Sequence, residues 1–127
     1  MKSSKFFLSS VLFLVLAAGQ LSLQVAQAHA ALQQSTPAAD AVVSGPQEID
    51  LVFNEKLLPR ASRVEILMMP GSSTMPIENF NTEIINDGKT LRAKLSQPLT
   101  AGEYRVDYRA VGSDNHPMTG SFSFTVR

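Results

Sequence analysis

Apolar and polar residues alternate with a period of two in several segments after residue 28, and this alternation is the main structural signal of the chain. The alternating segments are 49–54, 63–68, 91–95, 104–109 and 121–126. Successive side chains of a β-strand point to opposite faces, so each segment predicts a half-buried strand. After residue 28, no window of ten or more residues has apolar positions at helical spacing, so we expect a domain built from strands.

Short segments rich in glycine, proline and other turn residues separate the predicted strands. They are residues 44–46, 69–73, 86–89, 100–102 and 115–117. The dipeptide Asp87-Gly88, which lies between Ile85 and Leu91, predicts a tight hairpin. Short strands at this spacing are typical of an all-β fold, and we expect an immunoglobulin-like Greek-key barrel or sandwich of about seven antiparallel strands.

Residues 1–28 have the pattern of a secretory signal peptide. Lys2 and Lys5 precede an apolar run, and the small residues of Ala26-Gln27-Ala28 follow it. The alternative is an uncleaved membrane anchor, but polar residues interrupt the run before it reaches the ~20 residues that a span requires. We therefore expect an exported protein that is not embedded in a membrane after cleavage, with residues 29–127 forming a single β domain.

The position of the cut decides whether a histidine becomes the first residue of the mature protein. Cleavage after Ala28 leaves His29 at the N-terminus, whereas cleavage after Ala30 removes this histidine. We expect the first cut, because small residues stand at the required places before it and because it lies nearer to the apolar run.

Composition excludes several classes of chemistry. The sequence contains no cysteine, which excludes disulfides, thiolate metal sites and cysteine nucleophiles. Removal of Lys2 and Lys5 from the 11 basic residues leaves 9 against 11 acidic ones, a net charge of −2. No basic stripe is present, so we expect no nucleic-acid partner.

The two histidines of the chain are the best candidates for a functional site. A terminal His29 offers both its α-amine and its imidazole to one ion, and His116 with Asp114 adds a nitrogen and an oxygen. This set of three nitrogens and one oxygen suits Cu(II), although two histidines and a carboxylate could also hold zinc. Taken alone, Asp114 and His116 are also ordinary loop residues next to a proline.

Several longer motifs support the same interpretation. They are His29 after the leader, and the segments 35–38, 51–57, 98–111 and 113–120. With these motifs the chain resembles the CopC-type periplasmic copper-binding proteins, which are small Greek-key β-barrels. One departure is Tyr108, where the family usually has tryptophan.

The resemblance implies a function and a set of ligands. His29, Asp114 and His116 would hold Cu(II), and Glu55 would be a weak axial or outer ligand; the alternative for Glu55 is a solvent-exposed charge at the end of a strand. The implied protein is a non-catalytic copper carrier or buffer in the periplasm, which acts in copper homeostasis or resistance and passes the metal to an inner-membrane copper transporter.

Some members of this family also have a Cu(I) site in a methionine-rich loop. The matching segment here, residues 67–76, keeps three methionines and has no histidine. Thioethers favour Cu(I), and Met69 and Met75 are the two candidates for weak ligands. Met68 instead belongs to the inward face of its predicted strand, where methionine commonly fills gaps.

Two other functions remain open at this point. A terminal histidine with a second histidine is also the copper brace of polysaccharide monooxygenases, although Asp114 would occupy the position at which oxygen is activated, and the sequence has no tryptophan to hold a glycan. The other alternative is a metal-free immunoglobulin-like interaction module in which the histidines are incidental.

Overall fold

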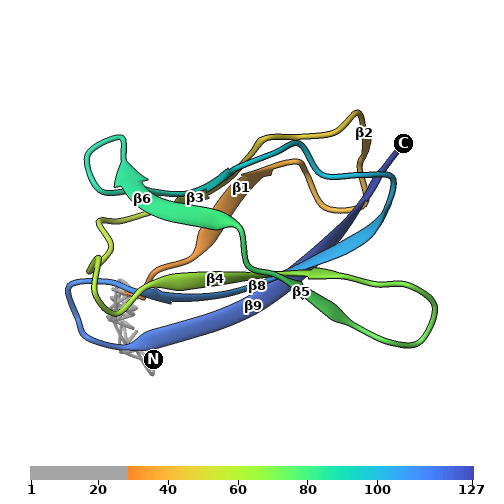
Figure 1. The fold of residues 1–127 in the computed structure, drawn as a ribbon. Coiled ribbons are helices and arrows are strands. Elements are labelled where there is room, and N and C mark those ends of the chain that lie inside the picture. Colours follow the sequence, from red (N-terminus) through yellow and green to blue (C-terminus); the bar gives the residue numbers. More distant parts are fainter. Residues whose placement is uncertain (1–28) are drawn as a thin grey trace, which may run out of the picture.

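The computed structural model describes residues 29–127, which form nine strands in two facing sheets (Figure 1). The strands are β1 (Leu32–Thr36), β2 (Val42–Val43), β3 (Glu48–Phe53), β4 (Arg63–Met68), β5 (Met75–Ile77), β6 (Phe80–Ile85), β7 (Thr90–Leu95), β8 (Gly102–Val111) and β9 (Pro117–Val126). One sheet has the order β1-β3-β7-β6 and the other the order β2-β9-β8-β4-β5. The predicted signal peptide and its cleavage site at residues 1–28 lie outside the described residues.

The predicted all-β fold is confirmed in its sandwich form, and the number and direction of the strands differ in part from the prediction. Nine strands are present where about seven were expected, because the short β2 and β5 carry no alternation that a sequence pattern could reveal. The sheets also do not close into a barrel, and β2 runs parallel to β9. Within residues 29–127 the structure contains no helix that could cross a membrane.

The core lies between the two sheets and consists of the inward residues of the alternating strands. Its largest fully buried side chains include Tyr104, Phe53, Phe124, Ile49 and Leu51. Burial of side chains of this size stabilises a fold by about 1.5–3 kcal/mol each, so the core needs no disulfide to hold it together. The predicted Asp87-Gly88 hairpin is also confirmed, since it joins β6 to β7.

Strand pairing brings distant segments together at one end of the sandwich. Leu32 of β1 lies opposite Phe53 of β3, so the residues before β1 lie beside the residues after β3. At the same end, Val111 pairs with Pro117, and the loop 112–116 joins β8 to β9. His29 and the loop that carries His116 therefore meet, although more than 80 residues separate them in the chain.

Candidate metal centre

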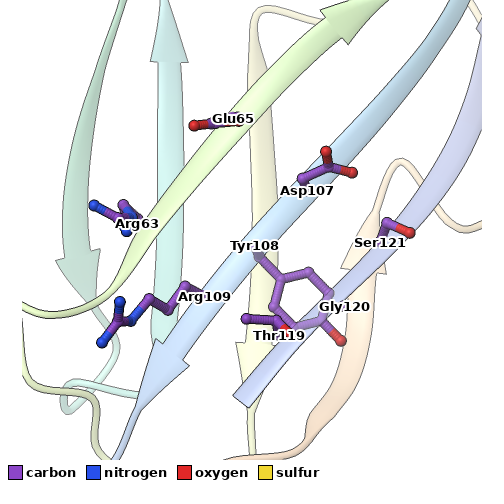
Figure 2. Close-up of a pocket in the computed structure, with 8 residues that line it drawn as sticks. All are labelled: Arg63, Glu65, Asp107, Tyr108, Arg109, Thr119, Gly120 and Ser121. Atoms are coloured by element: carbon purple, nitrogen blue, oxygen red, sulfur yellow. The ribbon is translucent and has the colours of Figure 1, made fainter. Parts of the chain in front are cut away.

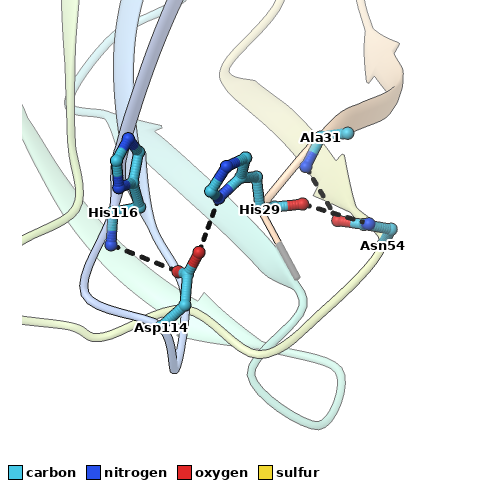
Figure 3. Close-up of polar contacts among 5 residues, drawn as sticks. All are labelled: His29, Ala31, Asn54, Asp114 and His116. Carbon is cyan, nitrogen blue, oxygen red and sulfur yellow. Dashed lines mark hydrogen bonds and ion pairs between the residues drawn. The ribbon is translucent and has the colours of Figure 1, made fainter. Parts of the chain in front are cut away.

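His29, Asp114 and His116 form a compact cluster at this end of the molecule (Figure 3). The Nδ1 of His29 lies 2.6 Å from the Oδ2 of Asp114, across 85 positions of sequence. The rings of His29 and His116 stack, with centroids 4.5 Å apart and planes inclined by 28°. The sequence grouped these three residues by chemistry alone, and the fold places them in mutual contact.

Asn54 holds the start of β1 in place. Its side-chain oxygen accepts a hydrogen bond from the backbone N–H of Ala31 at 2.7 Å, and its amide donates to the backbone oxygen of His29 at 3.3 Å (Figure 3). Its own backbone N–H donates to the oxygen of Ala31 at 3.1 Å. Three hydrogen bonds from one residue therefore fix the backbone that carries His29 against the end of β3.

The loop 112–116 is shaped by its own polar groups. The Oδ1 of Asp114 accepts a hydrogen bond from the backbone N–H of His116 at 3.2 Å, which is the contact typical of an Asx turn. Asn115 adopts a left-handed conformation with φ of 59°, and its N–H donates to the oxygen of Gly112 at 3.1 Å. These contacts place the carboxylate of Asp114 between its own loop and His29.

The electrostatics of the cluster favour an ionised carboxylate. The hydrogen bond from His29, followed by that from the backbone of His116, lowers the pKa of Asp114 below its usual range. A deprotonated carboxylate is the form that binds metal ions. The side chains of His29 and Asp114 are 38% and 20% exposed, so an ion from solvent can reach them.

Glu55 is half-buried, and its carboxylate packs against Gly112 at the start of the loop. Its Oε1 is buried and has no hydrogen-bond partner among the described residues. A side-chain carbon at Gly112 would lie 1.6 Å from this oxygen, so the carboxylate packs directly on the glycine backbone at the end of β8. For this oxygen, the interpretation of Glu55 as a solvent-exposed charge is therefore wrong.

The donors of the cluster are of the kinds that suit copper, but their side chains are not arranged around one point. Within residues 29–127, no group of three or more histidine, cysteine, aspartate or glutamate side chains is arranged to hold a metal ion. The reason is visible in the contacts: the Nδ1 of His29 is engaged with Asp114, and the two imidazoles stack on each other. Binding of an ion would replace this hydrogen bond and separate the rings.

The candidate Cu(I) ligands lie at the opposite end of the sandwich (Figure 1). Met68 of β4 stands opposite Met75 of β5, and Met69 begins the loop between these strands. Met68 packs against the core, as its pattern predicts, whereas Met75 is 56% exposed. Met69 and Met75 therefore lie in one hairpin, remote from the histidine cluster.

Sequence reasoning missed Asn54 as a residue that positions the site, and Gly112 as well. A polar residue at the end of the alternating segment 49–54 was the available signal for Asn54. For Gly112 the signal was a glycine between the predicted strand 104–109 and the Asp-x-His loop. Neither signal identifies the partner of the residue, because both contacts join segments that are distant in sequence.

Comparison with known proteins identifies relatives of this chain. The CopC domain family matches residues 32–127. Copper resistance protein C of Pseudomonas syringae pv. tomato is 42% identical over 114 residues, which are 87% of this chain and 90% of that protein. Copper transport protein CutJ of Bacillus subtilis is 27% identical over 128 residues, which are 99% of this chain and 22% of that longer protein.

A solved structure is also similar. The crystal structure of PcoC, described as a methionine-rich copper resistance protein from Escherichia coli, superposes with a TM-score of 0.73 at 40% identity and covers 79% of this chain and 100% of that one. These relatives are named for copper resistance or transport and not for an enzymatic reaction. The family match and the identity over most of both chains show that this protein belongs to the CopC family.

Proposed function

We propose that the mature protein binds Cu(II) through the amine and imidazole of His29, the imidazole of His116 and the carboxylate of Asp114. The observation that carries this proposal is the contact of these three side chains across 85 residues of sequence. Imidazole nitrogens favour Cu(II), which also heads the affinity order of divalent first-row metals. The copper resistance named for its relatives supports the same metal.

The proposal includes processing and location. Cleavage after Ala28 creates the terminal amine of His29, and the leader pattern of residues 1–28 supports export to the periplasm. Glu55 is a weaker participant, which acts as an axial or outer group from its position under Gly112.

The proposed role is that of a copper carrier or buffer in copper homeostasis or resistance. The ligands lie at an exposed chain end, so an acceptor protein can displace them one at a time. The proposed acceptor is an inner-membrane copper transporter. This partner is supported by the similarity of the chain to about a fifth of a longer protein that is named for copper transport. Protons compete with copper for the nitrogen ligands, so we expect affinity to fall as the pH drops below neutral.

A Cu(I) site at Met69 and Met75 is a second proposal. The exposure of Met75 and its position in one hairpin with Met69 support it, since thioethers prefer Cu(I). Two thioethers form an incomplete set, so we expect weaker binding here than at the histidine cluster.

Titration of the mature protein with Cu(II) tests the main proposal, with spin-resonance spectra to count the bound nitrogens. We expect His116→Ala to weaken binding by at least about 100-fold, because even the loss of an outer partner of a metal ligand costs 10–100-fold. Thermal unfolding of the metal-free variant should hardly change, since His116 is exposed in a loop.

Ser113→Ala, an exposed position in the same loop, is the matched control and should keep the affinity of the unaltered protein. Unchanged Cu(II) binding by His116→Ala would remove His116 from the ligand set. A large loss of metal-free stability would instead give His116 a structural role.

A further inference from the structure

The outer face of the five-stranded sheet carries like charges directly opposite each other (Figure 2). The register of β4 and β8 places Arg63 opposite Arg109, and Glu65 opposite Asp107. On β9, Thr119 continues the first pair and Ser121 the second. We call the first set the arginine row (Arg63, Arg109, Thr119) and the second the acidic row (Glu65, Asp107, Ser121).

The arginine row has no internal counter-charge. Within residues 29–127 neither Arg63 nor Arg109 forms an ion pair, and the Nε of Arg109 is buried without a hydrogen-bond partner. In contrast, Arg92 donates from its Nε to Asp50 at 2.7 Å, and Arg105, on the same face of β8 as the two rows, donates from its Nε to Asp107 of the acidic row at 2.9 Å. Like charges opposite each other on neighbouring strands are destabilising, so the arginine row carries a cost in the isolated chain, whereas Arg105 offsets part of the cost of the acidic row.

We propose that this face binds the same face of a second copy of the chain. A two-fold axis that lies between the copies, parallel to the rows and midway between them, places each arginine row on the acidic row of the other copy. Arg63 then faces Glu65 of the second copy, and Arg109 faces its Asp107. Such an interface uses one patch twice, which is the usual symmetry of protein dimers.

Charge and spacing favour a second copy over a free anion. On β4 and β8 this face carries three arginines (Arg63, Arg105, Arg109) and three acidic residues (Glu65, Glu103, Asp107), whose charges sum to zero, so the face attracts no anion over a distance. The rows lie two residues apart along each strand, about 6.6 Å. A second copy presents the same two rows at the same spacing, so both rows find a partner at once. The rows line a shallow hollow of about 500 Å³, which leaves room for the long side chains of the other copy.

The expected association is weak and depends on salt. Exposed ion pairs contribute little individually, and a face of a few short strands lies at the small end of specific interfaces. We therefore expect dimers at protein concentrations of roughly 0.1–1 mM in low salt. Because salt screens exposed charges, the dissociation constant should rise at least about tenfold between 20 mM and 500 mM salt.

Sedimentation equilibrium of charge-reversed variants tests the proposed register. Arg63→Glu places two carboxylates opposite each other in the dimer, and Glu65→Arg places two guanidinium groups opposite each other, so each variant alone should be monomeric. A mixture of the two variants should associate again, because each supplies the charge that the other lacks. Lys94→Glu has the same charge change on the other sheet and should leave association unchanged.

Three outcomes would overturn the proposal. They are an unaltered protein that stays monomeric at 1 mM in low salt, a dimer that survives both single reversals, and a mixture of the two variants that does not associate. Stabilisation of a monomeric protein by inorganic phosphate, lost in Arg63→Glu, would make the face an anion site instead. The proposal is independent of copper, since neither substituted residue belongs to the proposed ligand set.

Discussion

The two ends of the sandwich hold metal-binding side chains in different ways. At the histidine end, residues just before β1, at the end of β3 and in the β8–β9 loop hold one another through hydrogen bonds. At the methionine end, the candidates lie within one hairpin, and Met75 is exposed. The histidine end therefore depends on the whole fold for its geometry, whereas the methionine end depends on a single turn.

This difference affects how much free energy each end would need to order its ligands when a metal ion binds. At the histidine end the backbone that carries the candidate ligands is held by hydrogen bonds, so binding has to reorient only the side chains, and a backbone that is ordered in advance lowers the cost of binding. An exposed hairpin pays the cost of ordering its side chains at each binding event. Substitution of supporting residues should therefore lower metal affinity at the histidine end and should have little effect on it at the methionine end.

The glycines of the two ends give the largest expected contrast. In Gly112→Ala the new carbon would meet the carboxylate of Glu55, which must then leave its place under the loop. We expect Cu(II) affinity to fall about tenfold, in the range for loss of an outer partner. Gly71→Ala, in the methionine hairpin, has open space around it and φ of +64°, so it should cost about 1 kcal/mol of stability and leave Cu(II) affinity unchanged.

A double-mutant cycle separates Glu55 from other effects of Gly112→Ala. If displacement of the carboxylate is the cause, Glu55→Ala alone should weaken Cu(II) binding by about the same factor, and the double variant should be no worse than either single one. Additive losses would mean that Gly112 acts on the loop independently of Glu55. Isothermal titration of the four proteins measures the cycle.

Asn54→Ala should have a smaller effect on Cu(II). It removes two side-chain hydrogen bonds that hold the start of β1, so we expect a loss of about 1–2 kcal/mol in the free energy of unfolding. Cu(II) affinity should fall by less than in Gly112→Ala, because the donors of the cluster all remain. The control is Asn79→Ala, which alters an exposed asparagine between β5 and β6. Equal losses of Cu(II) affinity in both variants would remove the positioning role of Asn54.

The methionine end should give the smallest effect. We expect Met69→Leu with Met75→Leu to reduce Cu(I) retention only a few-fold, since two thioethers are a weak set, and to leave Cu(II) affinity unchanged. Competition with a Cu(I) chelator measures the first effect. No change in Cu(I) retention would mean that these methionines are not ligands.

Alternation in the sequence predicted those strands that have one buried face and one solvent-exposed face. β3 and β9 alternate regularly, and their apolar residues are buried as expected. β1 has a single apolar residue in LQQST, so its sequence pattern does not predict a strand. Its hydrogen bonds to β3 make it one. The parallel pairing of β2 with β9 depends on a contact across the chain, which no local pattern can reveal.

For the candidate site, the sequence predicted the donors but not their supports. His29 and Asp114 were grouped because their chemistry suits one ion, and the fold places them in contact. Asn54 and the packing of Glu55 on Gly112 were missed, since polar residues near turns are common and only the tertiary structure shows what they touch. A prediction from sequence can therefore find the candidate ligands but misses the residues that position them.

The central claim is that the terminal amine of His29 is a copper ligand. Cu(II) titration and spin-resonance spectra of the mature protein, compared with a version that carries one extra N-terminal glycine, test it most directly. We predict that the extension weakens binding by at least about 100-fold and changes the spectrum, because the amine then no longer belongs to the residue that chelates through its imidazole. Equal affinity and the same spectrum for both proteins would contradict the claim.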